Sequence, residues 1–193
     1  MYNYPISLAS GLIAMLFVFA SYMVSKKTGF LITQTVAIIF LSLSYLFVEQ
    51  YFAMIGMAFA AIRTVVYYLL ERKNKAPSFV LKSLFAFLSV LSYFVVNIII
   101  LESARYLDLL FLIANIMYAY LFGIRDLNLL RYLFLIPTAM VSVYNVIAPA
   151  SLFVIISYIF EFVVNVIGII KANVKEKREK VIPFSKHKKE VKV

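Results

Sequence analysis

Seven apolar runs, each about as long as a bilayer is thick, constrain this sequence more than any other feature. Crossing roughly 30 Å of hydrocarbon takes about 20 mostly apolar residues in a helix. The chain is 64% hydrophobic and only 15% charged, and a single soluble domain of 193 residues cannot bury that much apolar surface. We therefore expect an all-α polytopic membrane protein with seven transmembrane helices, in the ranges 7–25, 30–48, 51–70, 79–101, 107–123, 129–147 and 151–170.

The distribution of Lys and Arg predicts an orientation for these spans. If the connecting segments alternate between two sides, 17 of the 19 cations fall on one side, only Arg105 falls on the other, and Arg63 lies inside the third run. Cytoplasmic loops are enriched in Lys and Arg. The pattern predicts a cell-membrane protein with its N-terminus outside and its C-terminus in the cytoplasm.

The last segment, 171–193, is a basic tail with nine Lys or Arg and three Glu residues. Clusters of basic residues beside a membrane helix attract anionic lipid headgroups. We expect the tail to lie on lipid and to enforce orientation, with a docking site for a partner protein as the alternative. The tail has neither a regular interleaving of aromatic residues with the charges nor a nucleic-acid-binding motif, so nucleic acid is not an expected partner.

An internal repeat relates the two halves of the chain. Leu12-Ile13-Ala14 recurs as Leu112-Ile113-Ala114, and Tyr45 recurs as Tyr144, with an offset of 99 to 100 residues. The expected organisation is a first three-helix repeat (1–78), a linker helix (79–106), a second three-helix repeat (107–170) and the tail. Because one helix links the halves, both have the same orientation. This is the parallel-repeat layout of SWEET-type transporters, whose substrate site lies at the repeat interface near the midplane.

Two short motifs carry a family resemblance. Ala60-Ala61-Ile62-Arg63-Thr64 in the third run and the segment 165–171, NVIGIIK, resemble the YgjV family of bacterial inner-membrane proteins. The similarity extends from about residue 8 to 172 and leaves out the tail. It implies the three-one-three layout of SWEET sugar facilitators and PnuC vitamin transporters. The chain has no Pro-Gln dipeptide, so the mechanism of the PQ-loop branch is not implied.

Two charged residues lie inside the apolar runs, where charges are costly and usually face the bundle interior. Arg63 in the third run and Glu161 in the seventh lie at depths that differ by about 3 Å, at 1.5 Å per helical residue. Asn165 follows Glu161 by one helical turn, and a shift of 102 residues makes it the counterpart of Arg63. We predict that Arg63, Glu161 and Asn165 form a central site for a small polar or anionic solute. The alternatives are a purely structural Arg63–Glu161 ion pair and no contact between them.

The other polar residues in the runs are expected to have mainly structural roles. Asn115 is a secondary candidate for the solute site, whereas Asn97, Gln34 and Asn145 are expected to hydrogen-bond between helices. Pro137 should bend the sixth run, either as a static kink or as a hinge for alternating access.

Missing residue types bear on catalysis. The chain has no Cys, a single His in the tail and five scattered Gly residues, so zinc sites, Cys- or Ser-His nucleophiles and phosphate-binding loops are not expected. We expect no enzymatic activity and no cofactor. Two function classes remain: a small-solute transporter or facilitator, and a non-transporting accessory, sensor or immunity-type protein that acts through helix packing and its basic tail.

Overall fold

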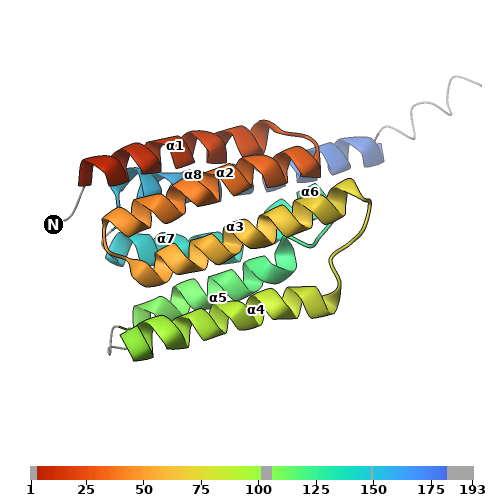
Figure 1. The fold of residues 1–193 in the computed structure, drawn as a ribbon. Coiled ribbons are helices and arrows are strands. Elements are labelled where there is room, and N and C mark those ends of the chain that lie inside the picture. Colours follow the sequence, from red (N-terminus) through yellow and green to blue (C-terminus); the bar gives the residue numbers. More distant parts are fainter. Residues whose placement is uncertain (1–3, 101–105, 149, 182–193) are drawn as a thin grey trace, which may run out of the picture.

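The computed structural model describes residues 4–100, 106–148 and 150–181, and the part described is helical without strands (Figure 1). The first half contains α1 (Tyr4–Met23), α2 (Lys27–Phe47), α3 (Tyr51–Arg72), α4 (Phe79–Tyr93) and the π-helix η1 (Phe94–Ile100). The second half contains α5 (Tyr106–Leu121), α6 (Leu127–Leu133), α7 (Leu135–Ile147) and α8 (Leu152–Val181). The all-α prediction is confirmed.

Four helical segments in the described ranges are long and apolar enough to cross a membrane: α1, α2, α3, and α4 with the first part of η1. A fifth span results if α6 and α7, which meet at an angle of 42°, are counted as one bent segment. Two further apolar helices, Tyr106–Leu121 and Leu152–Ile167, are shorter. Length and composition therefore define a multi-pass membrane protein.

The helices run side by side, and the chain reverses direction at the connections between them (Figure 1). The connections α1–α2, α3–α4 and α5–α6 lie at the same end of the bundle as the last turns of α8. The connections α2–α3 and α7–α8 lie at the opposite end, near the start of α1. The basic residues that follow α1, α3 and α5 in sequence are thereby brought to one end, which we call the basic end.

The bend between α6 and α7 has its cause in Pro137. A proline ring needs the space that the carbonyl of the residue four positions earlier occupies in a regular helix, and that residue is Leu133. Helix α6 ends at Leu133 and α7 begins at Leu135, so the predicted bend lies one turn before the proline itself.

The fourth run contains a feature that hydropathy does not predict. Helix α4 starts at the cap Ser78, whose hydroxyl accepts a hydrogen bond from the Leu81 amide, and changes to π-helix at Phe94. Asn97 in η1 is fully buried, but neither its amide nitrogen nor its amide oxygen has a hydrogen-bond partner in the described part of the chain. Its expected hydrogen bond to a neighbouring helix is therefore wrong for this conformation.

Helix α1 packs closely on α8 at Gly11. A Cβ atom placed there would lie 2.7 Å from Ser151 Oγ and 3.2 Å from Phe153 Cβ. Gly11→Val should therefore force the two helices apart and lower the free energy of unfolding by about 1–3 kcal/mol, the usual cost of overpacking. Unfolding of the purified protein in detergent measures this change. Ala9→Val, a small-to-large change at an exposed position of the same helix, is the matched control. Equal stability of the two variants would contradict close packing at Gly11.

Candidate functional site

A small buried cavity of about 30 Å³ lies within the bundle. By volume it has room for about one or two water molecules. Its walls come from α1, α2, α3, α5, α8 and the bend between α6 and α7, and no described residue of α4 or η1 contributes. The lining residues are Val18, Gln34, Ile38, Leu41, Met57, Ala60, Arg63, Asn115, Tyr118, Phe122, Phe134, Ser157, Tyr158 and Glu161.

The lining residues recur at helical spacing on each element. Helix α3 contributes Met57, Ala60 and Arg63, and α5 with the residue directly after it contributes Asn115, Tyr118 and Phe122. Residues three or four positions apart lie on one face of a helix. Each helix thus presents a single face to the cavity, while large apolar side chains on other faces, such as Leu16 and Ile62, are exposed toward the surrounding membrane.

Arg63 is the positive group of the cavity, with only 2% of its surface exposed. Its Nη1 donates a 3.1 Å hydrogen bond to the backbone carbonyl of Asn115, and its guanidinium carbon lies 5.4 Å from the ring centroid of Phe122. Both contacts are to α5 or the residue directly after it. The Nε atom is buried and has no partner among the described residues, so the guanidinium retains unused hydrogen-bonding capacity.

Glu161 is the negative group, with 5% of its surface exposed. Its Oε1 accepts a 2.9 Å hydrogen bond from the Tyr22 hydroxyl at the end of α1. Among the residues that the structure describes, Glu161 and Arg63 do not form an ion pair with each other. Each charge is therefore held by a different helix, and both line one cavity.

The two predicted asparagines have different positions. Asn115 lines the cavity, and its side-chain nitrogen donates to the Phe111 carbonyl one turn earlier at 3.1 Å. Asn165 is fully buried but does not line the cavity. Its amide nitrogen and oxygen have no hydrogen-bond partner in the described ranges. The structure thus brings Arg63, Glu161 and Asn115 together and places Asn165 one turn beyond them on α8.

Sequence reasoning missed the aromatic part of the cavity. Tyr118 lies three residues after Asn115, and Tyr158 lies three residues before Glu161, so helical spacing from the predicted polar residues contained this signal. Tyr22, which binds Glu161, carried no such signal because it belongs to a different helix. Gln34 had been assigned a structural hydrogen bond, and its Nε2 does donate to Ser21 Oγ at 3.0 Å, but it also lines the cavity.

The bundle is closed on the side of the cavity away from the basic end. The Tyr45 hydroxyl of α2 donates a 2.6 Å hydrogen bond to Asn145 Oδ1 of α7. Nearer the start of α1, the hydroxyl groups of Ser7, Ser44 and Ser151 join α1, α2 and the segment before α8, at separations of 2.9 and 3.0 Å.

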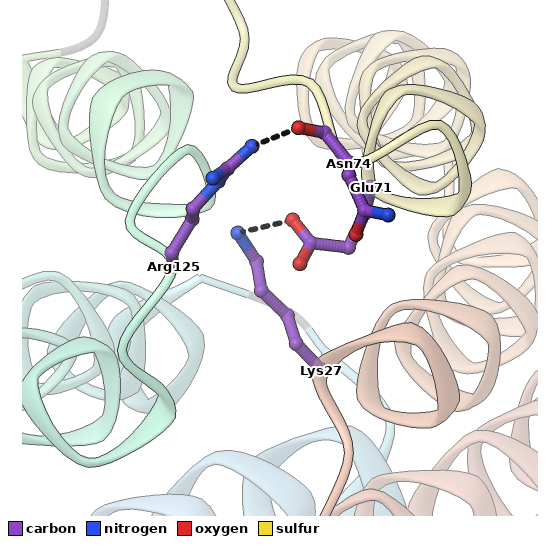
Figure 2. A network of polar contacts seen from close by, with 4 residues as sticks. All are labelled: Lys27, Glu71, Asn74 and Arg125. Carbon is purple, nitrogen blue, oxygen red and sulfur yellow. Dashed lines mark hydrogen bonds and ion pairs between the residues drawn. The ribbon is translucent and has the colours of Figure 1, made fainter.

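Polar contacts also close the basic end. The Lys27 ammonium and the Glu71 carboxylate lie 3.3 Å apart, and Arg125 donates to the Asn74 carbonyl beside them (Figure 2). Figure 2 shows these residues at the start of α2, at the end of α3 and in the connection after it, and in the connection after α5. Arg131 of α6 adds hydrogen bonds of 3.3 and 3.1 Å to two backbone carbonyls at the end of α1. Two sets of polar contacts thus join distant parts of the chain, one toward each end of the bundle.

The groups at this site suit the binding of a small ligand. It combines one cation, one carboxylate, amide groups and aromatic rings inside an apolar bundle. In the described ranges, no group of three His, Cys, Asp or Glu side chains is placed to hold a metal ion.

Long apolar helices around a core that contains a few buried polar residues define a multi-pass helical membrane protein. A comparison with family models gives the more specific assignment: the model Imp-YgjV, described as bacterial inner membrane protein, matches residues 6–176. The chain belongs to this family, and its location is the bacterial inner membrane. No curated protein and no solved structure matched the chain.

Proposed function

We propose that this protein is a transporter or facilitator of a small solute, with the cavity between its helices as the solute site. The observation that carries the proposal is a cavity between helices from the two halves of the chain, with mainly apolar walls and two charged residues, Arg63 and Glu161, that are not paired with each other. Unpaired buried charges are expensive in a membrane protein, and where they occur they usually mark a solute or ion pathway.

The proposed architecture has seven spans in a three-one-three arrangement. In it, α1, α2 and α3 form the first repeat, α4 with η1 is the linker, and α5, α6 with α7, and α8 form the second. The helix contacts support this arrangement because exchanging the repeats preserves them: α1 packs on α8, and α5, the equivalent of α1, packs on α3, the equivalent of α8. The linker packs on α3 and α5.

Single residues support the same symmetry. Gly11 of α1 lies at the crossing with α8, and its repeat counterpart Phe111 lies at the crossing of α5 with α3. At that second crossing, a Cβ on Gly56 would lie 2.8 Å from Phe111 Cε1. At each crossing, a glycine on one helix thus packs against larger groups of the other helix. The polar contacts follow the same rule, since Arg63 of α3 binds α5 and Glu161 of α8 binds α1.

The proposed orientation places the basic end and the C-terminus in the cytoplasm and the N-terminus outside. Lys26, Lys73 and Arg125 belong to connections at the basic end (Figure 1), and cytoplasmic loops are enriched in such residues. The basic tail would then lie against anionic headgroups of the inner leaflet.

Transport requires the cavity to open alternately to each side, and cysteine accessibility tests this directly because the natural chain contains no Cys. Ser157→Cys places a thiol on the cavity wall. We expect a charged, membrane-impermeant methanethiosulfonate reagent to label it in both right-side-out and inside-out vesicles. Open states populated at only about 0.1–10% suffice for slow labelling.

Ser89→Cys is the matched control. Ser89 is buried like Ser157, and both hydroxyls donate to the carbonyl four residues earlier, but Ser89 lies on α4 away from the cavity. It should stay unlabelled from both sides. Labelling of Ser157→Cys from neither side, or from one side only, would contradict transport and favour the non-transporting accessory or sensor function.

A further inference from the structure

We propose that the solute is a small zwitterion, with a carboxylate and an ammonium group separated by one or two carbon atoms, of the size of the smallest amino acids. This inference rests on the proposed function and specifies its substrate class. It is carried by two opposite charges that line one cavity and are not paired with each other.

The first step concerns what holds the two charges apart. Arg63 is fixed by the Asn115 carbonyl of α5 and by the ring of Phe122, the residue directly after α5. Glu161 is fixed by the Tyr22 hydroxyl of α1. Two opposite charges within a low-dielectric bundle attract strongly, and they remain separate here because each is anchored to a different helix. A ligand with both signs of charge complements this arrangement, whereas a singly charged ligand leaves one protein charge without a partner.

The second step concerns the donors and acceptors that remain. The planar guanidinium matches a carboxylate with two parallel hydrogen bonds, and Arg63 has a buried Nε with no partner among the described residues. The Glu161 carboxylate uses Oε1 for Tyr22, and a carboxylate has further acceptor positions for an ammonium group. The polar capacity of the cavity therefore matches one carboxylate and one ammonium.

The third step concerns size and the apolar walls. The cavity of about 30 Å³ is far below the roughly 300 Å³ at which pockets for drug-sized ligands begin, so only a small solute fits after modest opening. The rings of Tyr118, Phe122, Phe134 and Tyr158 line it. Aromatic faces attract ammonium groups and accommodate short alkyl chains, so these walls suit a small zwitterion.

The test compares compounds of matched size on the purified full-length protein. Alanine carries both charges, propionate lacks the ammonium group, and ethylamine lacks the carboxylate. We expect alanine or another small zwitterion from a panel with glycine, β-alanine and proline to raise the melting temperature, and to bind at least tenfold more tightly than either singly charged compound. Equal binding of propionate or ethylamine would overturn the inference.

Two substitutions show whether the charges act as proposed. In Glu161→Gln the preference for alanine over propionate should disappear, and in Arg63→Met the preference for alanine over ethylamine should disappear. A purely structural role of either residue would lower stability without changing these ratios. The control Arg72→Met, an exposed arginine at the end of α3, should keep both preferences.

The remaining outcomes separate this inference from the proposed function. If no zwitterion binds and Ser157→Cys is labelled from both sides, the site transports another class of solute and the inference is wrong. If no zwitterion binds and Ser157→Cys is unlabelled, the inference and the proposed function both fail.

Discussion

Arg63→Met should weaken binding of the solute by about 100-fold or more while leaving the free energy of unfolding unchanged or higher. Truncating one charged partner of a buried contact costs about 2–5 kcal/mol of binding, and 1.4 kcal/mol corresponds to tenfold. Folding should not suffer, because Arg63 forms no ion pair with Glu161 in the described part of the chain. Burying a charge without a charged partner is costly, so an apolar side chain of similar length removes that cost.

Solute titration and unfolding of the same detergent-purified samples measure the two effects. Arg72→Met provides the control for loss of one positive charge at an exposed site. The structural ion-pair hypothesis predicts the opposite pattern: Arg63→Met would leave Glu161 buried and unpaired and lower stability by about 3–5 kcal/mol. A loss of that size would contradict the solute site proposed for Arg63.

Phe111→Ala should lower the free energy of unfolding by about 3–5 kcal/mol, the usual cost of removing a large buried aromatic side chain. Phe111 is fully buried, and its ring lies 6.2, 5.7 and 5.0 Å from the rings of Tyr45, Phe52 and Tyr144, measured between centroids. It thereby joins α2, the start of α3, α5 and α7. In a membrane such packing is a main source of helix association, since lipid is as apolar as the side chains.

Phe87→Ala is the control for this change, because Phe87 is 60% exposed on α4 and should alter stability by no more than about 0.5 kcal/mol. A double-mutant cycle with Gly56→Ala sharpens the test. A Cβ on Gly56 would lie 2.8 Å from the Phe111 ring, so the added methyl should destabilise the natural chain and be tolerated once Phe111 is Ala. Additive effects would contradict a close crossing of α3 and α5 at these two residues.

The cavity shows which site residues can be predicted from local sequence patterns and which cannot. Arg63, Glu161 and Asn115 could be predicted because charges and amides in apolar runs are costly and therefore face the interior. That reasoning also included Asn165, which is buried but lies beyond the cavity. Helical spacing fixes the face of a residue but not where along that face a neighbouring helix leaves space. The partners of the two charges, an α5 carbonyl and an α1 hydroxyl, likewise depend on which helices meet.

The sequence by itself determined the class of the protein, because its long apolar runs suit only a bilayer. It also determined the bend before Pro137, which follows from the missing amide and the ring. Only the tertiary structure decided that Arg63 and Glu161 share a cavity without pairing, and that a π-helix begins at Phe94. These features depend on the relative placement of packed helices, and a one-dimensional pattern of hydropathy and charge contains no term for the distances between them.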